Sequence, residues 1–132
     1  MPEIKKRQSN GQLQSLENID VFCEKNVFEL DSTRQILQAG IAVGLRPNIH
    51  ADELYPLKGS ELAAKLKSTA ASHLEEISDE GIKALANAGT VAVLLPTTAY
   101  ILRLKAPPAR KMIENDVIVA LGSDVGSTVF NF

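Results

Sequence analysis

The sequence predicts an α/β fold built around a parallel sheet. Short apolar runs alternate with helical segments of about 8 to 12 residues, which is the pattern of consecutive strand–helix units. Five strand candidates begin near residues 19, 46, 70, 90 and 117, roughly one such unit apart. The same spacing suits a small doubly wound domain or five of the eight units of a (β/α)8 barrel, so the pattern leaves both architectures open.

The composition is that of an ordinary globular protein. Of the 132 residues 45% are hydrophobic and 23% are charged, which argues against disorder. The net charge is −2 and the basic run Lys5–Arg7 is short, so we expect no nucleic-acid partner. No apolar run approaches the roughly 20 residues of a membrane-spanning helix, so we expect no membrane association. The single cysteine, Cys23, cannot form an internal disulfide, which favours a reducing, cytoplasmic location.

Two regions differ in character along the chain. Residues 1–18 are polar and contain the turn signal Ser9-Asn10-Gly11, so we expect a lead-in segment there and one domain at 19–132. The run 90–95 is almost entirely apolar, as in a strand buried on both faces, whereas 70–74 has weak strand propensity. The five strands are expected at 19–24, 47–51, 70–74, 90–95 and 117–121.

Capping residues mark the helices between these strands. Asp31 and Ser32 offer an N-cap, and Gly44 offers a stop. Ser78 precedes acidic residues suited to a first helical turn, and Gly89 follows the last apolar position. The helices are expected at 31–44, from about 60 onward, at 78–89 and at 107–115.

Polar residues with catalytic chemistry lie at the ends of the predicted strands. Glu24, His50 and His73 each end a strand, and Asp124 follows the last strand. The carboxyl ends of parallel strands open onto one face, where sites in such folds are built. Histidine and aspartate are natural ligands of zinc and similar ions, and a nearby carboxylate or imidazole can act as a general base.

Structural roles are the alternative for each of these residues. A histidine at a strand end is often only hydrogen-bonded, Asp124 could cap a helix, and Glu24 could be exposed to solvent. The location of both histidines at strand ends favours the functional interpretation. Cys23 lies inside an apolar strand and is interpreted as a core residue. No phosphate-binding glycine loop, HExxH or paired CxxC motif is present.

Several strings resemble the imidazolonepropionase branch of the amidohydrolase superfamily. The resemblance runs from Ile19 to Asp124, and HADE followed by SHLE is its most specific part. The similar segments, in chain order, are Val21–Glu24, Ile49–Leu54, Ser72–Glu75, Val91–Ala99, Pro107–Arg110 and Val119–Asp124.

The resemblance implies a fold and a reaction. It implies that this chain is the C-terminal part of a (β/α)8 barrel, with its strands corresponding to barrel strands four to eight. The implied reaction is hydrolysis of 4-imidazolone-5-propanoate to N-formimidoyl-L-glutamate, a step of histidine degradation, with one zinc or iron ion. The resemblance also admits a homodimer of the full-length enzyme.

The resemblance further implies roles for four residues. His50 and Asp124 match metal ligands, and Asp124 also matches the group that handles the proton of the attacking water. Glu53 matches a glutamate that bonds the water or the substrate ring. His73 matches a histidine that polarises the ring carbonyl or stabilises the oxyanion, a suitable role for a donating imidazole.

The chain departs from the family pattern in two places. The H-x-H ligand pair of the first barrel strand is absent, and Val125-Gly126-Ser127 stands where the family continues Phe-Asn-Pro. Two protein ligands are fewer than a catalytic zinc site normally uses. We therefore expect the 132-residue chain alone to be inactive, and marginally folded because a barrel remnant exposes two sheet edges.

Two other functions remain open from the sequence. The chain could be a non-catalytic α/β remnant that binds a partner, for example a full-length subunit, through its exposed edges. It could also be a small doubly wound binding domain, which the similar strings make the least favoured of the three.

Overall fold

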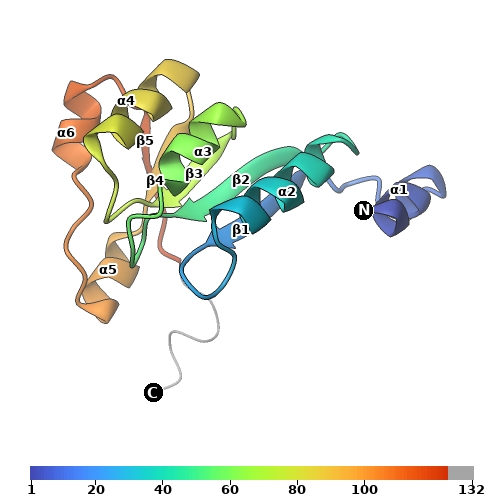
Figure 1. Cartoon of the computed structure of the whole chain (residues 1–132), viewed down its shortest axis with the longest axis horizontal. Helices are drawn as coiled ribbons and strands as arrows, with labels where there is room; N and C mark the ends of the chain where they lie inside the picture. The colour runs from blue at the N-terminus through green and yellow to red at the C-terminus, as the bar shows by residue number, and fades with distance from the viewer. Residues whose placement is uncertain (125–132) are drawn as a thin grey trace.

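A computed structural model describes residues 1–124 of the chain. Its centre is a sheet of five strands in which every neighbouring pair is parallel. The strand order is β1-β2-β3-β4-β5, identical to the order along the chain (Figure 1). The strands are β1 (Asn18–Cys23), β2 (Arg46–Ala51), β3 (Ala70–His73), β4 (Val91–Leu94) and β5 (Val119–Leu121).

Helices connect these strands. Helix α1 is the exception, because it precedes the sheet. It has no buried residue and stands apart from the rest of the molecule in Figure 1. None of the helices in the described part of the chain is long and apolar enough to cross a membrane. The helices are α1 (Pro2–Ser9), α2 (Leu30–Ile41), α3 (Gly59–Lys65), α4 (Asp79–Ala88), α5 (Pro96–Leu102) and α6 (Ala109–Glu114).

The strand order decides between the two architectures that the sequence left open. A doubly wound sheet reverses its strand order at a switch point and carries helices on both faces. Here the order never reverses, and right-handed crossovers between consecutive parallel strands place successive helices on one face. In agreement, α3 packs against both α2 and α4. The sheet is therefore an arc of a (β/α)8 barrel, as the resemblance implied.

The hydrophobic core lies between the sheet and this helix layer. Ile49 of β2 and Leu37 of α2 are fully buried, as are Leu85 of α4 and Met112 of α6. Alternate strand residues point into this layer, which explains the in–out burial pattern of β2. Gly59 begins α3 so close to β2 that a Cβ there would lie 2.7 Å from the Ala51 Cβ, and glycine is therefore needed for this packing.

The opposite face of the sheet is only half covered. Phe22, His50, Ser72 and Val93 occupy one register row across β1 to β4, and all four are of intermediate exposure. In a closed barrel this face lines the interior, where side chains from the other strands fill the space. Exposed Ile118 and Leu121 lie at β5, the opposite edge of the arc from β1.

Two of the predicted helix ends are confirmed and one is wrong. Ser78 is the N-cap of α4 and accepts a hydrogen bond from the Gly81 N–H, and Gly89 ends that helix in the left-handed conformation. The predicted N-cap of the first inter-strand helix is wrong. That helix begins at Leu30 with no side-chain cap bond, so Asp31 falls in its first turn, where the helix dipole favours an acidic residue.

Two helices were not predicted from the sequence. Helix α1 lies in the polar segment that we expected to be a lead-in, and its apolar content is too low to mark it as amphipathic. Helix α5 follows β4 directly, because Pro96 occupies a first-turn position where proline is tolerated. The second of these helices matters for function, since it borders the site described next.

Candidate functional site at the carboxyl ends of the strands

His50 is held by an aspartate from the neighbouring strand. Its Nδ1 lies 2.6 Å from Oδ2 of Asp20 on the adjacent strand β1, where Asp20 is two residues before Phe22, the register partner of His50. This hydrogen bond raises the pKa of His50, and burial opposes the rise. Because Asp20 occupies Nδ1, the other ring nitrogen, Nε2, is the one available to a ligand or substrate.

The backbone turns His73 toward the same region. His73 pairs with Ala51 in the sheet register, and strict alternation would point its side chain into the helix layer. Instead His73 has a φ of 76° and Leu74 a φ of 69°, both in the left-handed region that non-glycine residues rarely adopt. The His73 ring consequently lies against His50, with ring centroids 5.3 Å apart, while Leu74 is fully buried.

Two buried glutamates flank the His73 ring. Oε2 of Glu53 lies 3.6 Å from Nε2 of His73, and Oε2 of Glu75 lies 4.0 Å from Nδ1. Burial is the main cause that raises the pKa of Glu53, followed by the charges of Asp124 and Glu24. Burial likewise raises the pKa of Glu75 to about 7. The pKa of His73 is lowered by burial and by the neighbouring charge of His50.

Asp124 follows β5, the edge strand on the far side of the sheet from β1, and also lies near this region. Its Oδ2 accepts a hydrogen bond of 2.8 Å from the Thr98 hydroxyl of α5. The charge of Asp124 raises the pKa of His50 and of Glu53, which places the aspartate within electrostatic reach of both. The structure therefore places all four residues that the resemblance implied at the same end of the sheet, with Glu53 and Asp124 lining one pocket, and we refer to His50, Glu53, His73 and Asp124 as the strand-end cluster.

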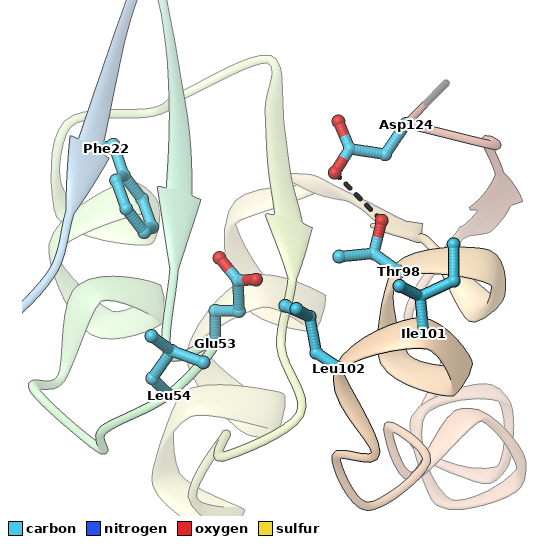
Figure 2. Close-up of a pocket in the computed structure, with 7 residues that line it drawn as sticks. All are labelled: Phe22, Glu53, Leu54, Thr98, Ile101, Leu102 and Asp124. Atoms are coloured by element: carbon cyan, nitrogen blue, oxygen red, sulfur yellow. Dashed lines mark hydrogen bonds between the residues drawn. The ribbon is translucent and has the colours of Figure 1, made fainter. Parts of the chain in front are cut away.

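A pocket of about 370 Å³ opens beside the cluster. Figure 2 shows Glu53 and the hydrogen-bonded pair Thr98–Asp124 on its wall, with apolar side chains around them. A pocket with a mainly apolar wall and a few polar groups suits a small cyclic molecule. Its apolar lining consists of Phe22 and Leu54 on the β1–β2 side and of Ile101 and Leu102 from α5.

Two other carboxylates near the cluster have structural roles. Glu24, which the sequence placed among the candidates, is 2% exposed and accepts hydrogen bonds from the Leu54 and Lys25 N–H groups. It therefore holds the loop after β2 instead of facing solvent. Asp52 accepts from the N–H groups of Gly59 and Ser60 and from the Ser60 hydroxyl, and so fixes the start of α3.

The donor atoms of the cluster fit a metal ion in kind but not in number. Imidazole nitrogen and carboxylate oxygen are suitable ligands for zinc or iron. Within residues 1–124, however, no group of three or more His, Cys, Asp or Glu side chains lies close enough to hold an ion. His50 and Asp124 could therefore supply two ligands only, and a tight site would need others from outside these residues.

Several residues of the site were not identified from the sequence. Asp20 lies outside the similar strings, and Thr98 lies inside the string Val91–Ala99 without a predicted role, because each acquires its role through a partner distant along the chain. Glu75 lies in the similar string SHLE but carried no predicted role. Cys23, predicted to be a core residue, is fully buried, and burial raises the pKa of its thiol. The departure at Val125-Gly126-Ser127 lies outside the described residues.

Curated proteins of the same kind match the whole chain. The chain is 58% identical over all 132 residues to the "Probable imidazolonepropionase" of Bos taurus and to that of Homo sapiens, and it covers 31% of each. The Dictyostelium discoideum protein of that name is 56% identical over 94% of the chain, which covers 29% of it. The similarity to imidazolonepropionases is thus confirmed along the chain. The chain spans about a third of the length of these relatives.

Solved structures with low sequence identity share the fold. A Xaa-Pro dipeptidase with bound methionine superposes with a TM-score of 0.62 at 16% identity, over 92% of this chain and 36% of that one. Guanine deaminase from C. acetobutylicum gives 0.61 at 18% identity, over 76% and 28%. The TrzN mutant of Arthrobacter aurescens TC1, complexed with zinc and atraton, gives 0.60 at 13% identity, over 92% and 32%. No family model matches the chain.

The two comparisons agree with the sheet topology. All three solved structures are more than twice the length of the segment that aligns with this chain. The fold is therefore part of a (β/α)8 barrel, and the similarity to imidazolonepropionases extends along every element from α1 to β5.

Proposed function

We propose that this segment forms part of an imidazolonepropionase and supplies the strand-end cluster for opening of the imidazolone ring. The observation that carries the proposal is that His50, Glu53, His73 and Asp124 lie at the same end of the sheet. They come from three different strand ends, since only His50 and Glu53 belong to the same strand and the loop that follows it. The proposed reaction is hydrolysis of 4-imidazolone-5-propanoate, in which water adds to the ring carbonyl carbon, a C–N bond breaks and N-formimidoyl-L-glutamate forms. The names of the relatives support this substrate.

His50 and Asp124 would hold a zinc or iron ion together with ligands from outside the described residues. Such an ion lowers the pKa of a bound water and polarises a carbonyl. Asp20 supports this assignment, since its hydrogen bond to Nδ1 of His50 leaves Nε2 directed away from the carboxylate. Thr98 supports the other ligand by holding one oxygen of Asp124. Such outer partners orient ligands in known metal sites.

Glu53 and His73 would act on the substrate itself. Glu53, whose pKa is raised by burial, would bond the attacking water or the substrate ring, and Asp124 would handle the proton of that water and pass it to the leaving ring nitrogen. His73 would donate a hydrogen bond from Nε2 to the carbonyl oxygen as negative charge develops on it. The two groups are already adjacent, at 3.6 Å.

Activity of a complete protein tests the proposal. The segment is placed in the bovine relative in exchange for the matching 132 residues, and turnover of 4-imidazolone-5-propanoate is followed by loss of its absorbance. We expect Glu53→Gln and His73→Asn each to lower kcat by about 10²- to 10⁴-fold. Glu80→Gln, an exposed position on α4, is the matched control and should retain full activity.

A second candidate function rests on the open edges of the sheet. Within the described residues, β1 and β5 each pair on one side only, and Ile118 and Leu121 are 62% and 76% exposed. Such edges favour pairing with another chain. If the chain acts as a binding remnant, it should form a stoichiometric complex with a full-length imidazolonepropionase subunit in size-exclusion chromatography. Fully active grafted protein that forms no such complex would argue for the enzymatic role instead.

A further inference from the structure

Glu75 is a buried acid for which the proposed reaction has no use. Its side chain is 1% exposed, and neither carboxylate oxygen has a hydrogen-bond partner among the described residues. A buried charged group without a partner is strongly destabilising. A second buried atom without a partner lies next to it, namely Nδ1 of His73, at 4.0 Å from Oε2.

The backbone brings these two groups together. The successive left-handed residues His73 and Leu74 break the side-chain alternation at the end of β3, and Oε2 of Glu75 lies 4.0 Å from Nδ1 of His73. This backbone is fixed by hydrogen bonds from the Leu74 N–H to the carbonyl of Ala51, the last residue of β2, and from the Glu76 N–H to the carbonyl of Asp52, which follows it. Strained backbone that is held in this way commonly belongs to a functional arrangement.

We propose that Glu75 is a positioning residue that shares one proton with Nδ1 of His73 and thereby keeps a hydrogen on Nε2, which faces Glu53. A separation of 4.0 Å is about 1 Å longer than a hydrogen bond and too short for a bridging water, so a small rotation of the carboxyl group closes it. The consequence for catalysis rests on the proposed function, in which Nε2 must be a donor.

The proton count is the same in both forms of the pair. Either the Glu75 carboxyl carries the proton and donates it to a neutral imidazole protonated on Nε2, or the carboxylate accepts from an imidazolium protonated on both nitrogens. In each form Nε2 retains its hydrogen.

Nuclear magnetic resonance of the ring nitrogens tests the proposal without any need for activity. The chain has two histidines, so ¹⁵N-histidine labelling produces two ring spin systems. We expect a proton on Nε2 of His73 in either form of the Glu75 pair, and a hydrogen-bonded proton on Nδ1 of His50 through Asp20. Glu75→Gln should shift or remove the His73 signal and spare that of His50, and the matched control Asp20→Asn should do the reverse.

Unchanged His73 nitrogen shifts in Glu75→Gln would overturn the proposal, as would a His73 Nε2 without a bound proton in the unaltered chain. Should Glu75→Gln fail to fold, Glu75→Met, which suits apolar surroundings, is judged by the same two signals. In the grafted bovine protein, Glu75→Gln should lower kcat by roughly 10- to 100-fold and leave KM within about twofold. If the His73 signals respond to Glu75→Gln as expected but the grafted bovine protein shows no turnover, the proposed function fails and the pairing of Glu75 with His73 stands.

Discussion

The imidazole rings of His50 and His73 lie with their centroids 5.3 Å apart and tilted by 47°, at the ends of the adjacent strands β2 and β3. Each ring has a carboxylate on its Nδ1 side, Asp20 for His50 and Glu75 for His73. Their pKa values nevertheless move in opposite directions, because His50 has a short hydrogen bond in a half-open position whereas His73 is buried. Two chemically identical groups thus acquire different pKa values from their surroundings.

Replacement of Asp20 by asparagine should lower the pKa of His50. The aspartate is the main cause of the raised value, and burial, which acts the other way, then dominates. A raised histidine pKa stabilises the folded chain below the unfolded value of about 6.5, and that contribution disappears as pH rises through the folded value. NMR titration of the His50 ring in both chains measures the change. An unaltered His50 titration would contradict the assigned cause.

Glu75→Gln should make stability less dependent on pH. Because the folded pKa of about 7 lies above the ordinary 4.5, the stability of the native chain is fully present below pH 4.5 and declines as pH rises through 7. The difference corresponds to roughly 3 kcal/mol at high pH. Urea unfolding at pH 5 and pH 9 should therefore show a loss for the native chain and little change for the variant. A parallel loss in both would rule out Glu75 as the source.

Asp52→Ala should destabilise the chain without any change in a catalytic group. Asp52 is buried and accepts three hydrogen bonds that fix the start of α3. Removal of its carboxylate leaves the three buried donor groups without an acceptor. We expect a loss on the order of 2 to 3 kcal/mol in urea unfolding. Asp31→Ala, at an exposed position in the first turn of α2, is the control and should cost less than about 1 kcal/mol.

Thr98→Val should weaken metal binding in the grafted bovine protein. The variant keeps the shape of the side chain but loses the hydrogen bond that orients Asp124. Loss of such an outer partner typically costs 10- to 100-fold in metal affinity. Competition with a zinc chelator measures the affinity, and Thr97→Val, one residue away, is the matched control. Equal affinities in the two variants would remove Thr98 from the site.

The purified 132-residue chain should show no turnover of 4-imidazolone-5-propanoate, with or without added zinc. The described residues supply two candidate metal ligands, His50 and Asp124, where three or more are normal. Steady-state assays at high enzyme concentration decide the matter. Detectable hydrolysis that is lost in His50→Ala would show that two ligands and water suffice.

Much of this protein was determined by the sequence alone. The alternation of strands and helices, the cap at Ser78 and the location of both histidines at strand ends follow from local propensity and periodicity, which neighbouring residues decide. The similarity of the strings around HADE and SHLE was likewise readable without coordinates. Helices α1 and α5 were missed, since short polar or proline-led helices carry little periodic signal.

Only the tertiary structure decided which side chains meet. The alternation of β3 would send His73 into the helix layer, and its left-handed backbone, fixed by contacts with β2, reverses that outcome. The pairing of Asp20 with His50, of Thr98 with Asp124 and of Glu75 with His73 depends on register and on loop packing. Such contacts arise from burial and from long-range hydrogen bonds, whose energies depend on the whole fold and not on local sequence.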